Sequence, residues 1–211
     1  MVDTFYMRRV PGVISESAPS AVDRRTAIAD AAITLLATEG SRRLTHRAID
    51  RALGFPEGST SAYLRTRASL FVAATNRLAE LDRASIADLA GRLVDTAEDA
   101  SPGRLIAAIV DDWTTPQAAP RQLARIELQL ESLRTPELAE VLAAQRSAFI
   151  GVTRALVQSF ELTPAAVADP DALAGVITAL VDGLIADRLL HQRTAAPGSG
   201  LADSLDVLLL P

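Results

Sequence analysis

The sequence predicts an all-α protein of about nine helices. Ala and Leu recur along the 211-residue chain, whereas aromatic residues make up only 4% of it. Apolar residues recur at spacings of three and four, which is typical of amphipathic helices and not of strands. Several helix starts are also marked by a capping side chain followed by proline, a combination that favours the first turn of a helix.

The first helices are defined by their end signals. Ser20 opens a segment that resembles a capping box, and Gly40 stops the helix that follows. Thr45 is the expected cap of a short helix that ends at Gly54. We expect a second short helix over about residues 58–64. Together these segments predict three helices in the N-terminal part.

The later helices begin mostly at cap-proline pairs. These pairs are Ser101-Pro102, Thr135-Pro136, Thr163-Pro164 and Asp169-Pro170. Apolar periodicity predicts helices over about 67–92, 102–113, 121–133, 136–160, 170–191 and 201–209. In the 121–133 helix, the expected inward stripe is Leu123, Ile126, Leu130 and Leu133.

Composition limits the classes of function. The chain has no cysteine and two histidines, which lie in different predicted parts, so we expect no metal site and no cofactor. No nucleophile elbow or glycine-rich phosphate loop is present, and we expect no enzyme. Charges interrupt the apolar segment 173–190, so it is a poor membrane span. We expect a cytoplasmic protein with a flexible tail at 1–19, in which Met7 is an alternative start.

One polar segment interrupts the core-building pattern. Residues 51–67, "RALGFPEGSTSAYLRTR", carry small hydroxyl side chains between arginines. Residues 20–67 hold eight arginines against five acids, although the chain has a net charge of -5. Two short helices joined by such a turn form a helix-turn-helix outline, and small side chains let a helix approach the DNA major groove. The alternative is a polar loop between two helices.

At these residues the chain resembles the tetracycline-repressor (TetR) family of bacterial one-component regulators. That family's pattern, T-x-x-x-I-A-x-x-A-G-V-S-x-G-T-L-Y-x-H-F-x-S-K-E-x-L, lines up without a gap on residues 45–70. The positions that match or are close substitutes are Thr45, Ile49, Gly54, Gly58, Leu64, Thr66, Arg67 and Leu70. The resemblance implies a DNA-binding domain at 20–66 and a helical effector-binding and dimerisation domain at 67–211.

From the outline and the resemblance together, we expect a DNA-binding surface. Its candidate residues are Thr45, Arg47, Gly58, Ser59, Thr60, Ser61, Tyr63, Arg65 and Arg67. The hydroxyls would reach base edges or phosphates, and the arginines would neutralise phosphates. Ser61 stands where the family usually has tyrosine, so the phosphate contact given to that tyrosine is expected to pass to Tyr63.

Helices near 136–160 and 170–191 are the expected homodimer interface. Apolar residues cover more than one face of the second helix, so one face can serve the subunit core and the other a partner. A four-helix bundle with the symmetry mate resembles the family's usual arrangement. Two recognition helices about 34 Å apart would read a near-palindromic operator. The alternative is full burial of this helix within one subunit.

Trp113, Arg125, Glu127 and Phe149 are the candidate effector-pocket residues, because polar groups on an apolar stripe need a partner or line a cavity. Taken singly, Trp113 could instead fill the core and Glu127 could pair with an arginine. We expect a repressor that a small-molecule effector releases from double-stranded DNA. The alternatives are a helical carrier or sensor of small molecules that does not bind DNA, and a helical enzyme, for which no catalytic group is apparent.

Overall fold

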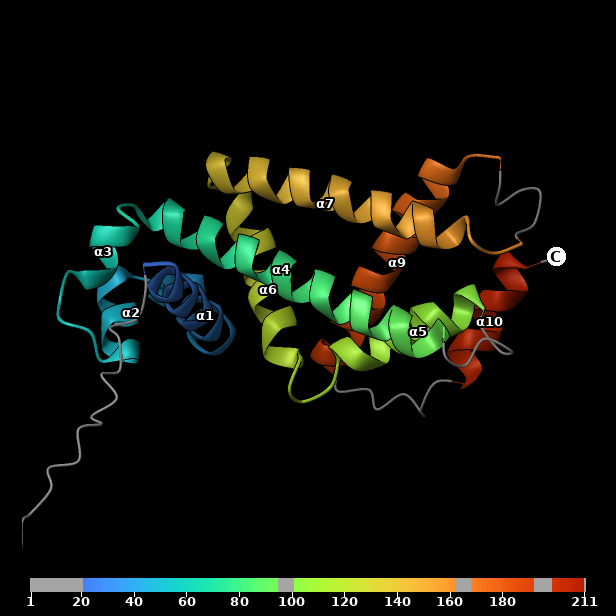
Figure 1. The fold of residues 1–211 in the computed structure, drawn as a ribbon, viewed down its shortest axis with the longest axis horizontal. Helices are drawn as coiled ribbons and strands as arrows, with labels where there is room; N and C mark the ends of the chain where they lie inside the picture. Colours follow the sequence, from blue (N-terminus) through green and yellow to red (C-terminus); the bar gives the residue numbers. More distant parts are fainter. Residues whose placement is uncertain (1–20, 95–100, 162–167, 192–198, 211) are drawn as a thin grey trace, which may run out of the picture.

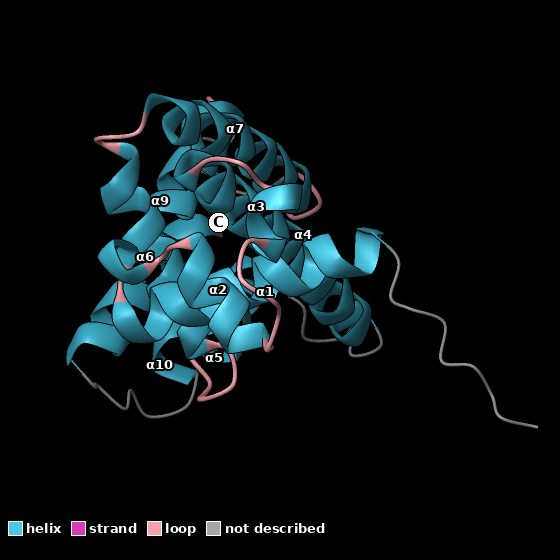
Figure 2. Cartoon of the chain, turned by 90° about the vertical axis from the view of Figure 1, so that its left-hand side faces the viewer, coloured by secondary structure: helices cyan, strands magenta, loops and turns pink. Residues whose placement is uncertain are grey.

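The structure is a computed structural model that describes residues 21–94, 101–161, 168–191 and 199–210. Over these residues it contains nine α-helices, one short 3-10 helix (η1) and no strand (Figures 1 and 2). The elements are α1 Ala21–Glu39, η1 Ser41–Arg43, α2 His46–Leu53, α3 Ser59–Tyr63, α4 Arg67–Val94, α5 Pro102–Trp113, α6 Ala119–Ser132, α7 Pro136–Val157, α9 Pro170–His191 and α10 Ser199–Leu209. The predicted all-α fold class is confirmed. No helix among the described residues is long and apolar enough to cross a membrane.

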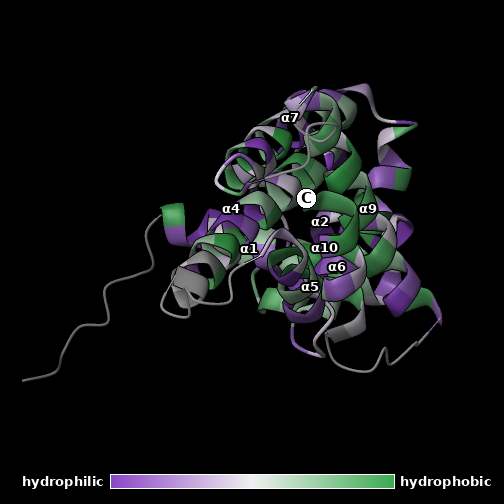
Figure 3. Ribbon diagram, turned by 90° about the vertical axis from the view of Figure 1, so that its right-hand side faces the viewer, coloured by the Kyte–Doolittle hydropathy of each residue, from purple (hydrophilic) through white to green (hydrophobic). Residues whose placement is uncertain are grey.

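Helices α1 to α3 form a head at one end of an elongated molecule (Figure 1). The long helix α4 runs from the head along the remaining helices, which form the body, while α7 lies beside it and α5 and α10 lie at the far end. Hydrophobic and hydrophilic residues alternate along these helices (Figure 3), which is the pattern expected of amphipathic helices that pack together.

Several helix starts are capped as the sequence predicts. Thr45 Oγ1 accepts a hydrogen bond from the Ala48 amide at 3.1 Å, and Ser101 Oγ accepts one from the Arg104 amide at 3.2 Å. Asp169 Oδ1 accepts from the Ala172 amide at 2.9 Å. The Thr135 side chain makes no capping bond, and the Thr163-Pro164 pair lies outside the described residues.

Two hydrophobic clusters make up the core. The head cluster joins α1, α2 and the first half of α4 to Ala124 and Leu128 of α6 and Leu138 of α7. The body cluster joins the second half of α4 to α5, α9 and α10. Because α6 contributes to the head cluster, the head and the body share one continuous packed region.

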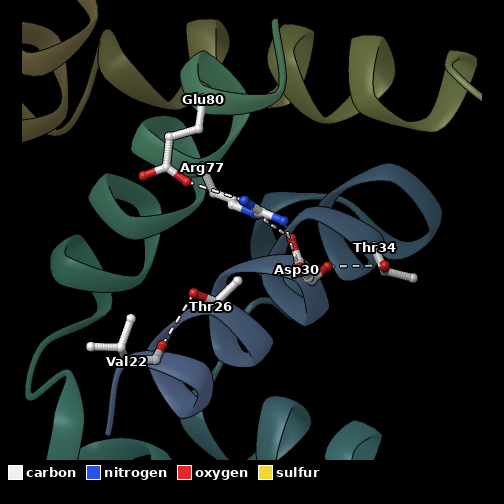
Figure 4. A network of polar contacts seen from close by, with 6 residues as sticks. All are labelled: Val22, Thr26, Asp30, Thr34, Arg77 and Glu80. Atoms are coloured by element: carbon white, nitrogen blue, oxygen red, sulfur yellow. Dashed lines mark hydrogen bonds and ion pairs between the residues drawn. The ribbon is translucent and has the colours of Figure 1, made fainter. Parts of the chain in front are cut away.

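A polar network also fastens α1 to α4 (Figure 4). The Arg77 guanidinium donates from Nε to Asp30 Oδ1 at 2.8 Å and from Nη1 to Glu80 Oε2 at 3.1 Å. The hydrogen bond to Asp30 is the main reason that the pKa of Arg77 is raised, although burial opposes it. The Arg77 side chain therefore links α1 of the head to the long helix α4.

The predicted inward stripe of α6 is partly wrong. Leu130 and Leu133 are 52% and 81% exposed, whereas Ala124, Leu128 and the carboxylate of Glu131 are buried. Helix α6 packs closely on α1, and Arg67 of α4 reaches Glu131 from that side. A charged partner on a neighbouring helix thus compensates the burial of Glu131, a residue outside the predicted apolar stripe.

Helix α10 packs on the start of α5. A Cβ atom at Gly103 would lie 2.3 Å from the carbonyl oxygen of Ala202, so only glycine permits this approach. Asp206 accepts hydrogen bonds from the Ser101 hydroxyl at 2.5 Å and from the Gly103 amide at 2.7 Å. These contacts hold the last described helix against the body.

Candidate functional site

Two glycines shape the turn between α2 and α3. Gly54 has φ +65° directly after α2, and Gly58 has φ +91° directly before α3. Both angles lie in the left-handed region that residues with a Cβ rarely adopt. The turn therefore brings α3 across α2 in the predicted helix-turn-helix arrangement.

Asp50 organises this turn. Its buried carboxylate accepts hydrogen bonds from the Gly58 amide at 2.8 Å, the Thr60 amide at 2.8 Å and the Thr60 hydroxyl at 2.6 Å. Burial raises the pKa of Asp50, but these hydrogen bonds and the nearby His46 outweigh it and hold the pKa below its ordinary value of 3.8. Sequence reasoning missed this residue. The available signal was a carboxylate in the last turn of a helix, where the dipole disfavours it without an outside partner.

Thr60 differs from its sequence prediction. Its side chain is fully buried and donates to Asp50, so it does not lie on the outer surface of α3. The expected contact between Thr60 and DNA is therefore replaced by a structural role. A buried hydroxyl needs a hydrogen-bonding partner, and Asp50 supplies it from α2.

The outward side of α3 is small and polar. Ser61 and Ala62 are exposed, while Ser59 is half-buried and Tyr63 packs partly against the head cluster. Ser61 Oγ donates to the carbonyl of Gly58 at 2.8 Å, which leaves its oxygen free to accept from another group. This surface can approach another molecule closely.

The start of α2 lies beside the end of α3. His46 Nε2 lies 2.6 Å from the carbonyl oxygen of Leu64, so Thr45 and Arg65, which adjoin these two residues, belong to the same part of the surface. Both side chains are exposed. Arg47 is exposed as well, and its Nε lies 3.6 Å from Glu57 Oε1, a distance at which solvent weakens the ion pair. The head thus presents two guanidinium groups near the exposed side of α3.

Arg67, in contrast, bonds to other residues of this chain. Its guanidinium donates to the carbonyls of Leu44 at 3.2 Å and Ser41 at 2.5 Å, and it lies 3.6 Å from Glu131 Oε1. It also stacks over the Phe71 ring at 4.8 Å. These contacts give Arg67 a structural role, in which its donors tie the loop after α1 to α4 and α6, while its side chain stays 44% exposed.

Glu127 also contacts the loop after α1 and not a pocket. Glu127 Oε2 accepts a hydrogen bond from the Ser41 amide at 2.9 Å, at the start of η1. It does not line the main cavity, and it pairs with a backbone amide instead of an arginine. Both sequence interpretations of Glu127 are therefore wrong, because neither considered an unpaired amide in a loop 86 residues away.

A cavity of about 760 Å³ lies among α4, α5, α6, α7 and α9. Trp113, Arg125 and Phe149, three of the four predicted pocket residues, line it. A smaller cavity of about 30 Å³ shares Ile86, Phe149, Val152, Leu156 and Thr178 with it and is lined mainly by apolar side chains. Pockets of several hundred Å³ with apolar walls and a few polar groups are typical ligand sites.

Contacts around Trp113 fix one wall of this cavity. Trp113 is 3% exposed, and its Nε1 donates to Ser85 Oγ at 3.1 Å. Its ring lies 6.1 Å from that of Phe149, and the Arg125 guanidinium lies over it at 5.4 Å. The same arginine reaches Asp82 of α4 at 2.5 Å. Trp113 is therefore both a core residue and a cavity residue.

Helix α6 contacts the cavity and the head at once. Arg125 and Gln129 line the cavity, whereas Leu128 is buried in the head cluster and Glu127 and Glu131 bond to the loop after α1 and to Arg67. Helix α6 therefore forms a wall of the cavity and also packs against the head.

Helices α7 and α9 pack against each other and also expose apolar side chains. Val152 of α7 is 41% exposed, and Val176 and Leu180 of α9 are 64% and 38% exposed. Ile177 and Val181 of α9 are buried in the body cluster. Full burial of α9 within one subunit is therefore wrong, and an apolar face is available to a partner.

Among the described residues, no group of three or more His, Asp or Glu side chains could hold a metal ion. His191 Nδ1 lies 3.2 Å from Asp187 Oδ1 on an exposed part of α9. His46 belongs to the head and bonds to Leu64. The two histidines lie in different parts of the molecule.

Comparisons with known proteins relate the chain to one family. The family model of the tetracyclin repressor-like C-terminal domain matches residues 97–210. A solved structure described as a TetR-family transcriptional regulator from Rhodococcus sp. is 25% identical, covers 88% of this chain and 98% of its own, and has a TM-score of 0.70. The multidrug binding protein EbrR in complex with imidazole is 26% identical, covers 92% and 97%, and has a TM-score of 0.65. Its complex with ethidium is 25% identical, covers 89% and 99%, and has a TM-score of 0.63. No curated protein sequence matches the chain.

Proposed function

The chain belongs to the TetR family of transcriptional regulators, and we propose that it is a repressor that a small molecule releases from a near-palindromic operator. The observation that carries this proposal is the exposed, small and polar side of α3, which Asp50 holds across α2. Such a helix can enter the major groove, and its hydroxyls can bond to base edges.

The charged groups around α3 support binding to DNA. Arg47 and Arg65 are exposed near the ends of α2 and α3, where they can neutralise phosphates. Thr45 and Ser61 add hydroxyl oxygens on the same surface, and the half-buried Tyr63 adds its phenol. We assign sequence readout to Ser61, with Ser59 beside it, and general affinity to the arginines.

We further propose that the protein acts as a homodimer through the exposed apolar faces of α7 and α9. Val152, Val176 and Leu180 offer the apolar surface that a four-helix bundle with a second subunit would cover. A two-fold axis through this bundle places two copies of α3 on one side of the duplex, and a spacing of about 34 Å fits successive major grooves.

Release from DNA would proceed through α6. An effector in the 760 Å³ cavity contacts Arg125 and Gln129, while the other side of α6 bonds to the loop after α1 through Glu127. An effector that binds better to a differently spaced pair of heads draws the population away from the DNA-bound state. The EbrR complexes with imidazole and ethidium support a small-molecule site in this fold.

Selection of bound duplexes from a random DNA pool tests the proposal. We expect enrichment of a near-palindrome, and we expect Arg65→Gln to weaken binding to every sequence and to lower its salt dependence. Ser61→Ala should change the preferred sequence, whereas Arg134→Gln, in the exposed turn after α6, serves as a charge-matched control outside the head. A chain that prefers no duplex over a scrambled one would be a small-molecule carrier or sensor instead of a repressor.

A further inference from the structure

Five ionisable side chains line the main cavity, and four of them neutralise one another. Arg125 Nη2 donates to Asp82 Oδ2 at 2.5 Å, and Arg146 Nη1 donates to Asp182 Oδ2 at 2.8 Å. A cationic ligand that approached either carboxylate would also meet the guanidinium already paired with it. The cavity therefore offers a positive ligand little net attraction.

Arg83 is the fifth of these side chains. It lies on α4 next to Asp82, its side chain is exposed, and within the described part of the chain it makes no ion pair. Its guanidinium is always charged and carries five N–H donors, a geometry that suits a carboxylate. The cavity thus has one positive group available for an anion.

Arg125 cannot take that role without losing other contacts. Its Nε donates to Gln122 Oε1 at 3.0 Å, its Nη2 donates to Asp82, and its face lies on the Trp113 ring. The Asp82 carboxylate is almost fully buried, so separating this pair would leave an uncompensated charge. Arg125 is better placed to position Trp113 than to bind an anion.

Apolar side chains line another part of the cavity. Ile86, Phe149 and Val152 line both the main cavity and the smaller one, whose other walls include Ile106 and Ile177. Both of these isoleucines belong to the body cluster. An apolar group that enters here is removed from water, which favours binding in proportion to the buried area.

We propose that the cavity binds an amphipathic organic anion, with its carboxylate on Arg83 and its apolar body against Ile86 and Phe149. This inference rests on the proposed role of the cavity as the effector site. A volume of about 760 Å³ accommodates a drug-sized molecule of this kind. The charge pattern distinguishes it from a lipophilic cation and from a neutral lipid.

Three probes that differ only in their polar end test the proposal: decanoate, decan-1-ol and decylammonium. Trp113 is the only tryptophan of the chain and lines the cavity, so its fluorescence reports on this site, and calorimetry gives an independent affinity. We expect decanoate to bind roughly two- to fivefold more tightly than decan-1-ol, as an ion pair with an exposed guanidinium implies. Decylammonium should bind most weakly.

Arg83→Gln should remove the preference for decanoate and leave the affinity for decan-1-ol unchanged. Arg51→Gln, which changes the same charge on the exposed side of α2, is the matched control and should keep the preference. Equal binding of decanoate and decan-1-ol, tightest binding of decylammonium, no binding of any probe, or an undiminished preference in Arg83→Gln would each overturn the proposal.

The same protein is tested for DNA binding in parallel. Sequence-specific binding to a selected duplex without any preference for decanoate refutes the anion proposal and leaves the repressor proposal intact. A preference for decanoate that depends on Arg83, in a chain that prefers no duplex, supports the anion site and refutes the repressor proposal.

Discussion

Replacing Asp50 by alanine removes the acceptor for three hydrogen bonds that hold α3 on α2. Each hydrogen bond to a charged group contributes about 1.5–3 kcal/mol, but neighbouring losses are not additive, and water can reach the amide of the exposed Gly58. We therefore expect Asp50→Ala to lower the free energy of unfolding by about 3–4 kcal/mol. Denaturant titration followed by far-ultraviolet circular dichroism at pH 7 measures this change.

Two further variants test whether a loss of stability comes from the hydrogen bonds to Asp50 or from any substitution in the head. Thr60→Val removes the hydroxyl and leaves both backbone amides bonded to Asp50, so we expect a loss of about 1–2 kcal/mol. Glu57→Ala removes an exposed carboxylate that is only weakly paired with Arg47, and we expect less than about 0.5 kcal/mol.

The order of the free energies of unfolding of these three variants tests whether Asp50 organises the turn. An Asp50→Ala protein as stable as Glu57→Ala, within about 0.5 kcal/mol, would refute the assignment of Asp50 as the residue that organises the turn. If the assignment holds, Asp50→Ala should also bind DNA more weakly than Thr60→Val, because α3 loses its fixed position.

Three further predictions concern pH, packing and assembly. Because the pKa of Asp50 is lowered in the native state, its stabilising contribution is present above its unfolded value of 3.8 and is lost as pH falls through the native value. The free energy of unfolding should thus fall less steeply below about pH 4 in Asp50→Asn than in the parent chain, and equal slopes would contradict this. Gly103→Ala should lower the midpoint of denaturation by the equivalent of about 1–3 kcal/mol, since its Cβ would meet the carbonyl of Ala202, whereas Gly175→Ala, with open space in α9, should not destabilise the protein. Leu180→Glu should shift sedimentation from dimer to monomer without loss of helical circular dichroism, and an unchanged dimer would exclude this face as the interface.

Features with local causes could be predicted from the sequence. The starts of α2, α5 and α9 follow from a capping side chain or a proline, the end of α2 follows from Gly54, and the structure places these boundaries within a residue of the prediction. The helix-turn-helix outline, and through it the resemblance to the TetR family, depends on the spacing of residues in one short segment. Trp113, Arg125 and Phe149 were also identified, because a polar residue near an apolar stripe marks either a partner or a cavity.

Contacts between distant segments required the tertiary structure. In α3, Thr60 turns inward and Ser61 outward only because Asp50 lies beneath one side of a five-residue helix whose polar residues show no periodicity. Arg67 and Glu127 resemble a surface cation and a pocket anion in the sequence, yet both bond to the loop after α1.

The sequence by itself determined where the helices of this regulator begin and end, because capping and backbone conformation depend on neighbouring residues. The tertiary structure alone decided which side of α6 faces the head and which faces the cavity. The physical reason is that Glu131 and Glu127 can be buried only where a guanidinium or an amide from a segment far away in the chain compensates the charge.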